Sequence, residues 1–504
     1  MRQRLSPEEK RQAWLWAALI VLMMLAAGIG GYRLCAYVRE PSPALPAESE
    51  ELLEAARGLD SIRITAALDP GLKRLDVTQE MMLCNRTGQE QASVVLRSWT
   101  GAYRTASASP AATDELFASC YGAVFDPGGL VLQSVRVNGS PVLWHWLDDA
   151  QTVLSLPVQW PEGTDASVTL TYHVDIPGCA SRFGYAEGVF MLGNVFPVAA
   201  VWADGAWRTD PYAGVGDPFM SECANWTVQL SVPAGYTAAA SAYAVPVETE
   251  GRWRYDFSGS ALRDFALVVS DRFVAVQGMA DGTLVTAYAR RRDDAEAILR
   301  YARQAMESYG RRWGSYVYPS FTLTEAVFPY GGMEYPGMVM LASQAMGGLA
   351  LEQLVAHETA HQWWAVMVGS DSFHQPWQDE SLCEYAMMDY IGDVYGASVR
   401  ASAVFDRIET SLRITVPRGV TPGSPVSYFA DLAEYEQVVY QRGAALWTAL
   451  EKYLGKAGLD ALLKDYLMQY RFRIALRDDL TALISQHAGQ DMSGLLLDYL
   501  DTYI

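Results

Sequence analysis

The most restrictive feature of the sequence is a change in the spacing of its apolar residues near position 280. Before that point apolar and polar residues alternate over long stretches, for example from Val168 to Ile176. A period of two is typical of a β-strand with one buried face. The Asn138-Gly139 pair between two apolar stretches predicts a hairpin, because both central positions of such a turn need positive φ. We therefore expect a half-buried antiparallel β domain over residues 61–278.

Beyond position 280 the apolar residues recur every three or four positions, which is the period of an amphipathic helix. The pattern predicts a mainly helical domain over residues 279–504. Its later helices are expected at about 350–367, 379–395, 398–413, 434–454, 457–470, 477–487 and 491–503. Because 504 residues exceed one ordinary hydrophobic core, we expect a multidomain α+β fold.

The charge and cysteine contents exclude several classes of protein. The chain has 38 Lys and Arg against 58 Asp and Glu, and this acidic balance argues against a nucleic-acid partner. Six cysteines are scattered over the chain without a Cys-x-x-Cys pair. They predict neither a disulfide-dense scaffold nor a thiolate zinc site, and the sequence leaves their pairing open.

A long uncharged run lies near the N-terminus. Between Arg11 and Arg33 there are 21 residues without a charged side chain, enough for a helix of roughly 30 Å. Four basic residues precede the run, which places the N-terminus in the cytoplasm by the positive-inside rule. We therefore expect residues 1–40 to form a cytoplasmic tail and a single-pass anchor in the cell membrane, spanning residues 13–32. The alternative is a cleaved signal peptide, but no small-x-small cleavage site follows the run.

The segment after the expected anchor has a different composition. Residues 41–60 are rich in Pro, Ala and Glu and show no apolar period. This composition predicts a linker that holds an extracytoplasmic body away from the bilayer. From residue 41 onward the chain has 32 Lys and Arg against 55 Asp and Glu, so the expected outer part is more acidic than the whole.

One short motif within the helical half carries chemistry. His357-Glu358-Thr359-Ala360-His361 places two imidazoles four residues apart, and therefore on one face of a helix. Two such imidazoles can bind one tetrahedral zinc ion while Glu358 faces the open coordination position. The alternative is a pair of surface histidines on an amphipathic helix. A third ligand decides between the two interpretations.

The choices for a third ligand lie downstream of the motif. A metzincin would have its third histidine at position 367, which is Met367, so that class is excluded. His374 lies in an expected loop, and a lone histidine there is more often a packed or exposed residue than a metal ligand. Glu380, separated from His361 by 18 residues, falls in the first turn of an expected helix, where the helix dipole favours the ionised form. Glu384 follows one turn later and suits a role in orienting a histidine, or is an ordinary solvated carboxylate.

Three motifs together resemble those of a known family. HETAHQWW, Glu380 after 18 residues, and an upstream GGMEYPG are similar to the M1 zinc aminopeptidases, a gluzincin group that includes aminopeptidase N and leukotriene A4 hydrolase. The resemblance covers residues 60–504. It implies a β saddle domain followed by a thermolysin-like catalytic domain with one Zn²⁺ per chain. It also implies His357, His361 and Glu380 as metal ligands and Glu358 as the general base.

The resemblance extends to two further segments. Residues Gly331, Gly332, Met333 and Glu334 match the family's Gly-x-Met-Glu-Asn motif, which implies that they bind substrate and that Glu334 receives a free α-ammonium group. Tyr335 replaces the family's Asn. Tyr440 matches a Tyr-x-Lys-Gly-Ala segment, which implies a hydroxyl that donates to the oxyanion. Without the resemblance, the glycines would indicate a plain turn and Tyr440 a core residue.

These features lead us to expect a membrane-anchored zinc metallopeptidase that removes N-terminal residues from peptides with a free N-terminus. The chain ends where the family's catalytic domain stops, so we expect a short form without the C-terminal helical domain. An endopeptidase or other hydrolase on the same zinc site is the nearer alternative, favoured if Glu334 is turned away from the cleft. A non-catalytic subunit of a membrane complex is the more distant one, and Glu358 argues against it because a structural zinc needs no base.

Overall fold

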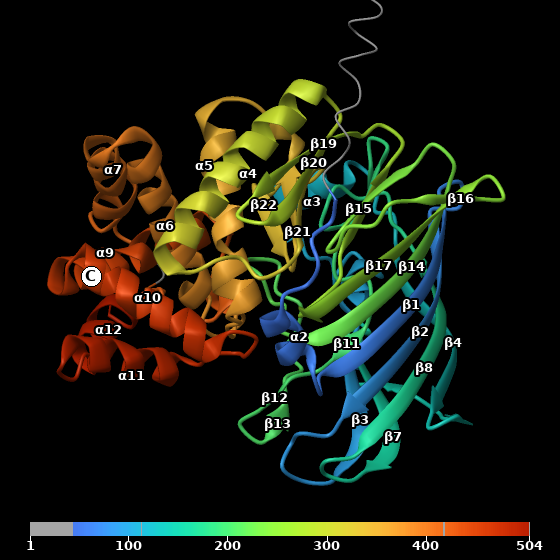
Figure 1. Ribbon diagram of the computed structural model, residues 1–504. Coiled ribbons are helices and arrows are strands. Elements are labelled where there is room, and N and C mark those ends of the chain that lie inside the picture. The colour runs from blue at the N-terminus through green and yellow to red at the C-terminus, as the bar shows by residue number, and fades with distance from the viewer. Residues whose placement is uncertain (1–43, 112, 417–418, 503–504) are drawn as a thin grey trace, which may run out of the picture. The chain divides into compact units, whose positions relative to one another are not determined.

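The computed structural model describes residues 44–111, 113–416 and 419–502 (Figure 1). The expected cytoplasmic tail and the membrane helix at residues 13–32 lie outside these residues. Among the helices that the structure describes, none combines the length and the apolar composition that a bilayer crossing requires. The β-rich part precedes the helical part, as the change of period predicts.

An eight-stranded sheet dominates the first part, in the order β16-β17-β14-β1-β2-β8-β4-β5 (Figure 1). Its strands are β1 (Asp60–Asp69), β2 (Arg74–Cys84), β4 (Gly129–Val137), β5 (Ser140–Pro141), β8 (Asp165–Asp175), β14 (Ala224–Pro233), β16 (Val247–Thr249) and β17 (Arg252–Leu262). Every pair is antiparallel except β1 with β14, which is parallel and departs from the wholly antiparallel expectation. Burial alternates along β8, and Asn138 and Gly139 both have positive φ in the turn between β4 and β5, as predicted.

Smaller sheets complete the β-rich part. One four-stranded sheet has the order β11-β3-β7-β6 and another has the order β15-β18-β10-β9. Their strands are β3 (Gln91–Arg97), β6 (His145–Trp146), β7 (Val153–Trp160), β9 (Phe183–Ala186), β10 (Val189–Leu192), β11 (Val198–Ala199), β15 (Thr237–Ala240) and β18 (Leu267–Ser270), with a separate hairpin of β12 (Trp202–Ala203) and β13 (Ala206–Trp207). Two short helices, η1 (Trp99–Tyr103) and α3 (Asp114–Tyr121), lie between β3 and β4.

The predicted linker is not an extended spacer throughout. Helix α2 (Glu50–Ala56) occupies part of it, with the Ser49 side chain accepting a hydrogen bond from the Leu52 backbone at its N-terminus. Leu52 is fully buried, and the Glu48 carboxylate accepts hydrogen bonds from the backbone and hydroxyl of Ser260 in β17. A single buried leucine in a seven-residue helix produces no recognisable period, so this contact could not be predicted from the sequence.

The second part opens with a sheet that the sequence did not predict. Its order is β19-β20-β21-β23-β22, from β19 (Val274–Ala280), β20 (Thr283–Ala289), β21 (Ser320–Ala326), β22 (Gly332–Tyr335) and β23 (Met338–Ala342). The expected boundary at residues 278 and 279 falls inside β19. Strands β20, β21 and β23 run parallel and are buried along their whole length, so they show no alternation that would reveal them.

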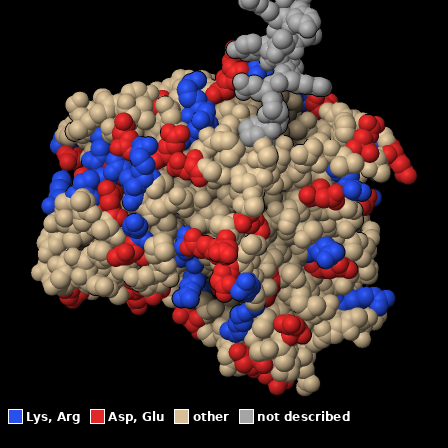
Figure 2. Space-filling model, in the orientation of Figure 1, with Lys and Arg blue, Asp and Glu red and all other residues tan. Residues whose placement is uncertain are grey.

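Helices pack on this sheet and continue to the end of the described chain. They are α4 (Arg292–Trp313), η2 (Ser343–Ala345), α5 (Gly348–Ala360), η3 (Gln362–Met367), α6 (Trp377–Tyr395), α7 (Ala397–Val404), η4 (Phe405–Glu409), η5 (Val426–Tyr428), α8 (Leu432–Tyr435), η6 (Glu436–Arg442), α9 (Gly443–Leu454), α10 (Lys456–Tyr470), α11 (Arg477–Ala488) and α12 (Ser493–Leu500). Each predicted helix has a counterpart. Three are interrupted by π-helical segments, at η3, η4 and η6. On the face shown in Figure 2, acidic and basic side chains lie interspersed.

Candidate metal centre

Two histidines lie side by side at the end of helix α5. His357 and His361 are one turn apart, are 7% and 1% exposed, and bring their Nε2 atoms within 3.1 Å of each other. Helix α5 is buried along its inner face by Leu351, Val355, Ala356 and Ala360, which fixes the direction of the two imidazoles. Immediately after His361 the α-helix gives way to the π-helical turn η3, where Trp364 leaves helical φ and ψ.

Helix α6 brings a carboxylate to the same point. Glu380 lies in its first turn, and its Oε2 atom is 3.3 Å from His357 Nε2 and 3.2 Å from His361 Nε2. The three donor atoms therefore converge although 18 residues separate the two segments. Two imidazole nitrogens and one carboxylate oxygen are a donor set that fits a zinc ion with an open fourth position.

Electrostatics keep Glu380 in its ionised, ligating form and place negative charge beside both imidazoles. Burial raises the pKa of Glu380, but the adjacent imidazoles of His361 and His357 outweigh it and hold the pKa below its usual range. Burial lowers the pKa of His357, while hydrogen bonds to Glu380 and Glu384 outweigh it and raise the pKa to about 9. Glu380 is thus ionised. A metal ion would displace the proton from His357 when it binds the Nε2 atom.

A neighbouring carboxylate supports the far side of the His357 imidazole. His357 Nδ1 is 3.7 Å from the Glu384 carboxylate, which accepts a 2.5 Å hydrogen bond from Arg407 Nε in η4. The Cys383 side chain contacts His361. Sequence reasoning found Glu384 but missed Cys383 and Arg407. Cys383 could have been noted from its place one turn after Glu380, whereas Arg407 carries no local signal.

Glu358 is buried beside His357, His361 and Glu380, and one of its carboxylate oxygens lacks a partner among the described residues. It is 5% exposed, and no described residue hydrogen-bonds its Oε2 atom. Burial raises its pKa to about 8, against the lowering effect of His357. A Cβ on Gly332 would lie 2.2 Å from Glu358 Oε1, so the glycine makes room for this carboxylate. An unpartnered buried carboxylate at this place fits a group that exchanges protons with a bound molecule.

The residues of the motif at 331–334 do not all face the cavity. Gly331, Gly332 and Glu334 line a cavity of about 430 Å³ that also exposes His357, Glu358 and His361. Glu334 Oε1 lies 3.9 Å from His361 Nδ1, and burial raises the pKa of Glu334 to about 8. Met333 does not line this cavity. Its side chain is 3% exposed and packs in a hydrophobic cluster, because successive residues of a strand face opposite sides.

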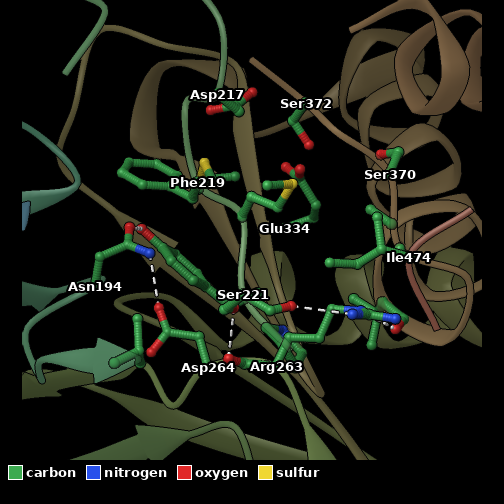
Figure 3. Close-up of a pocket in the computed structure, with 18 of the residues that line it drawn as sticks. Asn194, Asp217, Phe219, Ser221, Arg263, Asp264, Glu334, Ser370, Ser372 and Ile474 are labelled. Carbon is green, nitrogen blue, oxygen red and sulfur yellow. Dashed lines mark hydrogen bonds between the residues drawn. The ribbon is translucent and has the colours of Figure 1, made fainter. Parts of the chain in front are cut away.

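A smaller pocket of about 70 Å³ adjoins the cavity at Glu334 (Figure 3). Met333 and Tyr335 line it. The Tyr335 hydroxyl donates to Asn194, which donates in turn to Asp264 over 2.7 Å. Tyr335 fits because residue 193 is glycine, where a Cβ would lie 1.9 Å from the Tyr335 hydroxyl. The tyrosine that replaces the family's Asn is thus held by the β-rich part of the chain.

Tyr440 lies on the π-helical segment η6 and lines the larger cavity. Its ring stacks on the His357 imidazole at 5.4 Å between centroids and 14° between planes. Its side chain also hydrogen-bonds Glu380, and burial raises its pKa well above the usual value. Tyr435, which sequence reasoning missed, meets Tyr440 edge to face and lines the same cavity. The two phenols therefore both line the cavity beside His357.

Two residues of the β-rich part, Arg182 and Asp217, also line the cavity and form an ion pair. Asp217 Oδ1 lies 2.5 Å from Arg182 Nη2, and the Arg182 guanidinium lies 4.7 Å from the centre of the Tyr330 ring. Burial raises the pKa of Asp217 to about 7 although Arg182 lowers it. Neither residue belongs to a local motif, and sequence reasoning missed both.

His374 does not join the cluster. Its Nδ1 atom lies 3.0 Å from Asp371, and its Nε2 atom lies 3.4 Å from Asp210 of the β-rich part. Hydrogen bonds to Asp210 and Asp371 raise its pKa to about 9. The structure thus places His374 in a contact between the two parts, as a packed histidine.

Comparison with known proteins gives a family and a fold. Residues 298–499 match the peptidase family M1 domain. Leukotriene A-4 hydrolase of Xenopus laevis is 27% identical over 187 residues, which are 36% of this chain and 30% of that protein. Leucine aminopeptidase 2-1 of Meyerozyma guilliermondii is 25% identical over 186 residues, 35% of this chain and 30% of that one. The match thus spans less than a third of the length of these relatives.

Solved structures extend the likeness over most of the chain. The M1 zinc metallopeptidase of Deinococcus radiodurans has a TM-score of 0.66 and 15% identity, covering 88% of this chain and 94% of its own. A mutant of that enzyme bound to a Tyr-Ser-Ala substrate has a TM-score of 0.64 and 15% identity, covering 89% and 95%. The two-part fold is therefore shared well beyond the matched domain. Residues 298–499 of this chain thus resemble the peptidase family M1 domain.

Proposed function

We propose that this protein is a zinc-dependent aminopeptidase that removes N-terminal residues from peptides. One observation carries the proposal. Glu334 faces the same cavity as the His357, His361 and Glu380 cluster, and ligand-type atoms of Glu334, Glu358 and His361 lie within 4.8 Å of one another. A buried carboxylate beside a hydrolytic centre is suited to the free α-ammonium group of a peptide. Relatives named as aminopeptidases support this proposal.

His357, His361 and Glu380 would hold the zinc ion, one per chain. When bound, zinc polarises the scissile carbonyl and lowers the pKa of water at its open position. Glu384 orients His357 through Nδ1, and Arg407 keeps Glu384 in place. These contacts hold the ligands before the metal arrives and reduce the cost of ordering them.

Glu358 acts as the general base. Its Oε2 atom is buried without a partner among the described residues, so the ionised carboxylate can accept a proton from the attacking water. A cation bound beside it would favour this ionised form against burial, which raises its pKa to about 8. The same carboxyl group then delivers the proton to the leaving amine. Gly332 fixes its position, since a side chain there would displace the carboxylate.

Tyr440 donates its hydroxyl proton to the oxygen that becomes negative as water adds to the carbonyl. Stacking on His357 holds the ring in place before the reaction, so that no reorganisation is needed. Burial keeps the phenol protonated at neutral pH, which is the form that can donate.

Glu334 sets the position of cleavage at one residue from the N-terminus. Its side chain is only 12% exposed, so little water can solvate the carboxylate. A bound ammonium group would supply the opposite charge that compensates for this burial. The alternative of an endopeptidase requires Glu334 to turn away from the cleft. Its place in the cavity wall favours the aminopeptidase instead.

We further propose that residues 13–32 anchor the protein in the cell membrane and that the peptidase stands outside the cytoplasm. The uncharged run of 21 residues and the basic residues before it support this arrangement. Short peptides would then reach the cavity by diffusion.

Replacement of Glu334 by Ala should remove most activity towards peptides with a free N-terminus. N-acetylated peptides should be poor substrates of the native protein, because they leave the buried carboxylate unpaired. The measurement is kcat/KM on matched free and acetylated peptides, with and without a zinc chelator. Glu436→Gln is the control, since Glu436 also lines the cavity but its side chain is 56% exposed. Equal cleavage of free and acetylated peptides would favour the endopeptidase.

Replacement of Glu384 by Ala should weaken zinc binding by about 10-fold to 100-fold, because His357 loses the group that orients its Nδ1 side. Competition with a coloured chelator measures the affinity without relying on activity. Glu409→Ala is the matched control, since Glu409 pairs with Lys452 at the surface and not with a histidine. Unchanged zinc affinity in the Glu384 variant would show that this carboxylate has no role at the metal.

Protease added to intact cells should degrade the peptidase while sparing a tag fused before Met1. A cytoplasmic protein in the same cells serves as the control for intact membranes. Release of a soluble protein lacking residues 1–40 would instead indicate a cleaved signal peptide. Full protection of the peptidase would contradict its placement outside the cytoplasm.

A further inference from the structure

Two cysteines meet behind the cavity. Cys120 lies in the last turn of helix α3, and Cys179 lies in the loop between β8 and β9. They are 6% and 1% exposed, and both are free thiols in the structure. The backbone N–H of Ala180 donates to the carbonyl of Cys120 over 2.8 Å, and the two thiols hydrogen-bond each other. Segments that are distant in sequence thus place two sulfur atoms together.

The backbone around this pair is held independently of the thiols. The Cys179 and Tyr185 N–H groups both donate to the Pro177 carbonyl, over 2.9 and 2.8 Å. Residue 184 must be glycine, because a Cβ there would lie 2.2 Å from the Cys179 carbonyl oxygen. A disulfide needs its two cysteines close together, and the main-chain hydrogen bond from Ala180 to Cys120 holds the two segments side by side at this point. A bond could therefore form without moving either segment far.

The two thiols differ in their readiness to react. The hydrogen bond from Cys179 lowers the pKa of Cys120, and the positive charge of Arg182 lowers it further against the effect of burial. Burial raises the pKa of Cys179, and its interaction with Cys120 adds to the rise. Since the thiolate is the attacking form, Cys120 is the sulfur that reacts first.

We propose that Cys120 and Cys179 form a disulfide when the chain folds in an oxidising compartment. The oxidant is a small or protein disulfide, such as oxidised glutathione. The Cys120 thiolate attacks one of its sulfurs, forming a mixed disulfide and releasing one thiol. Cys179 then loses its proton and attacks the Cys120 sulfur, which releases the second thiol. Two electrons and two protons pass to the oxidant, and the intramolecular bond remains.

The other described cysteines, Cys84, Cys223 and Cys383, lie in different surroundings. Cys223 and Cys383 are buried in other parts of the fold, Cys383 beside His361 and Cys223 near Arg263. Cys84 is half-buried at the end of β2 and neighbours Asp165 and Arg86. Within the part of the chain that the structure describes, the contacts of these three thiols are with other residue types.

The bond would stiffen the wall of the substrate cavity. Tyr330, which lines the cavity, lies close enough to both cysteines for their charge to affect its pKa. Leu116 and Ser119 of helix α3 share a small groove with Pro329. A cross-link from α3 to the loop before β9 would therefore restrain the segments that neighbour Pro329 and Tyr330. This consequence for substrate binding rests on the proposed aminopeptidase function, whereas the bond itself does not.

Peptide mapping of the full-length protein tests the bond directly. The protein is produced once by export to an oxidising compartment and once in a reducing cytoplasm, and free thiols are alkylated under denaturing conditions. We expect the peptide with Cys120 to be linked to the peptide with Cys179 in the exported sample, while Cys223 and Cys383 are alkylated. Alkylation of both Cys120 and Cys179 in that sample, or a bond to another cysteine, would overturn the proposal.

Thermal unfolding gives a second measurement. The oxidised protein should melt roughly 5 °C or more above the same protein in dithiothreitol, because the bond closes a long loop. Cys120→Ser and Cys179→Ser should both abolish this difference. Cys223→Ser, the matched buried control, should retain it. A melting temperature that does not respond to the reductant, or a response that survives in both Cys120→Ser and Cys179→Ser, would contradict the bond.

Kinetics test the link to the cavity separately. Reduction should raise KM for a tripeptide in the native protein and leave it unchanged in the double serine variant. An unchanged KM would overturn the link between the bond and residues 329–332. A protein without peptidase activity would contradict the proposed function, while peptide mapping would still decide whether the bond exists.

Discussion

The structure depends on the convergence of three buried donor groups. The Nε2 atoms of His357 and His361 and the Oε2 atom of Glu380 lie 3.1 to 3.3 Å apart. The two imidazoles can lie this close because the negative charge of Glu380 is near both of them. A metal ion at this point can also accept a lone pair from each of the three groups. Helices α5 and α6 must therefore hold a fixed mutual position, and their packing on each other and the packing of α5 on strands β22 and β23 keep it. Glu384 and Arg407 extend the same arrangement outward.

Small residues and the β-rich first part of the fold shape the space around this cluster. Gly332 makes room for Glu358, and the alternation of strand β22 turns Glu334 into the cavity while Met333 packs into the core. The β-rich part closes the far wall with the Asp217 and Arg182 pair. The cavity is therefore a joint product of both parts, although the reacting groups come from the helical one. A disulfide beneath Tyr330 would reinforce the same wall.

Local patterns allowed much of this to be predicted from the sequence, and long-range contacts explain the rest. Alternation revealed strand β8, and the spacing of His357 and His361 on one helix needed no tertiary information. Strands β20, β21 and β23 escaped because burial on both faces removes alternation. The π-helical segment that carries Tyr440 looks like an ordinary helix in sequence, since the extra residue per turn leaves no composition signal. Asp217 and Arg407 reach the site only through folding, so no motif could name them.

The most direct test of the account is the zinc content and turnover of the Glu358→Gln variant. The amide keeps the shape that Gly332 accommodates but cannot accept a proton. The account predicts one zinc per chain, an unchanged melting temperature, and kcat on a free-amine peptide lowered by about 100-fold or more. Turnover close to that of the native protein, with zinc still bound, would contradict the assignment of Glu358 as the base and the hydrolytic mechanism built on it.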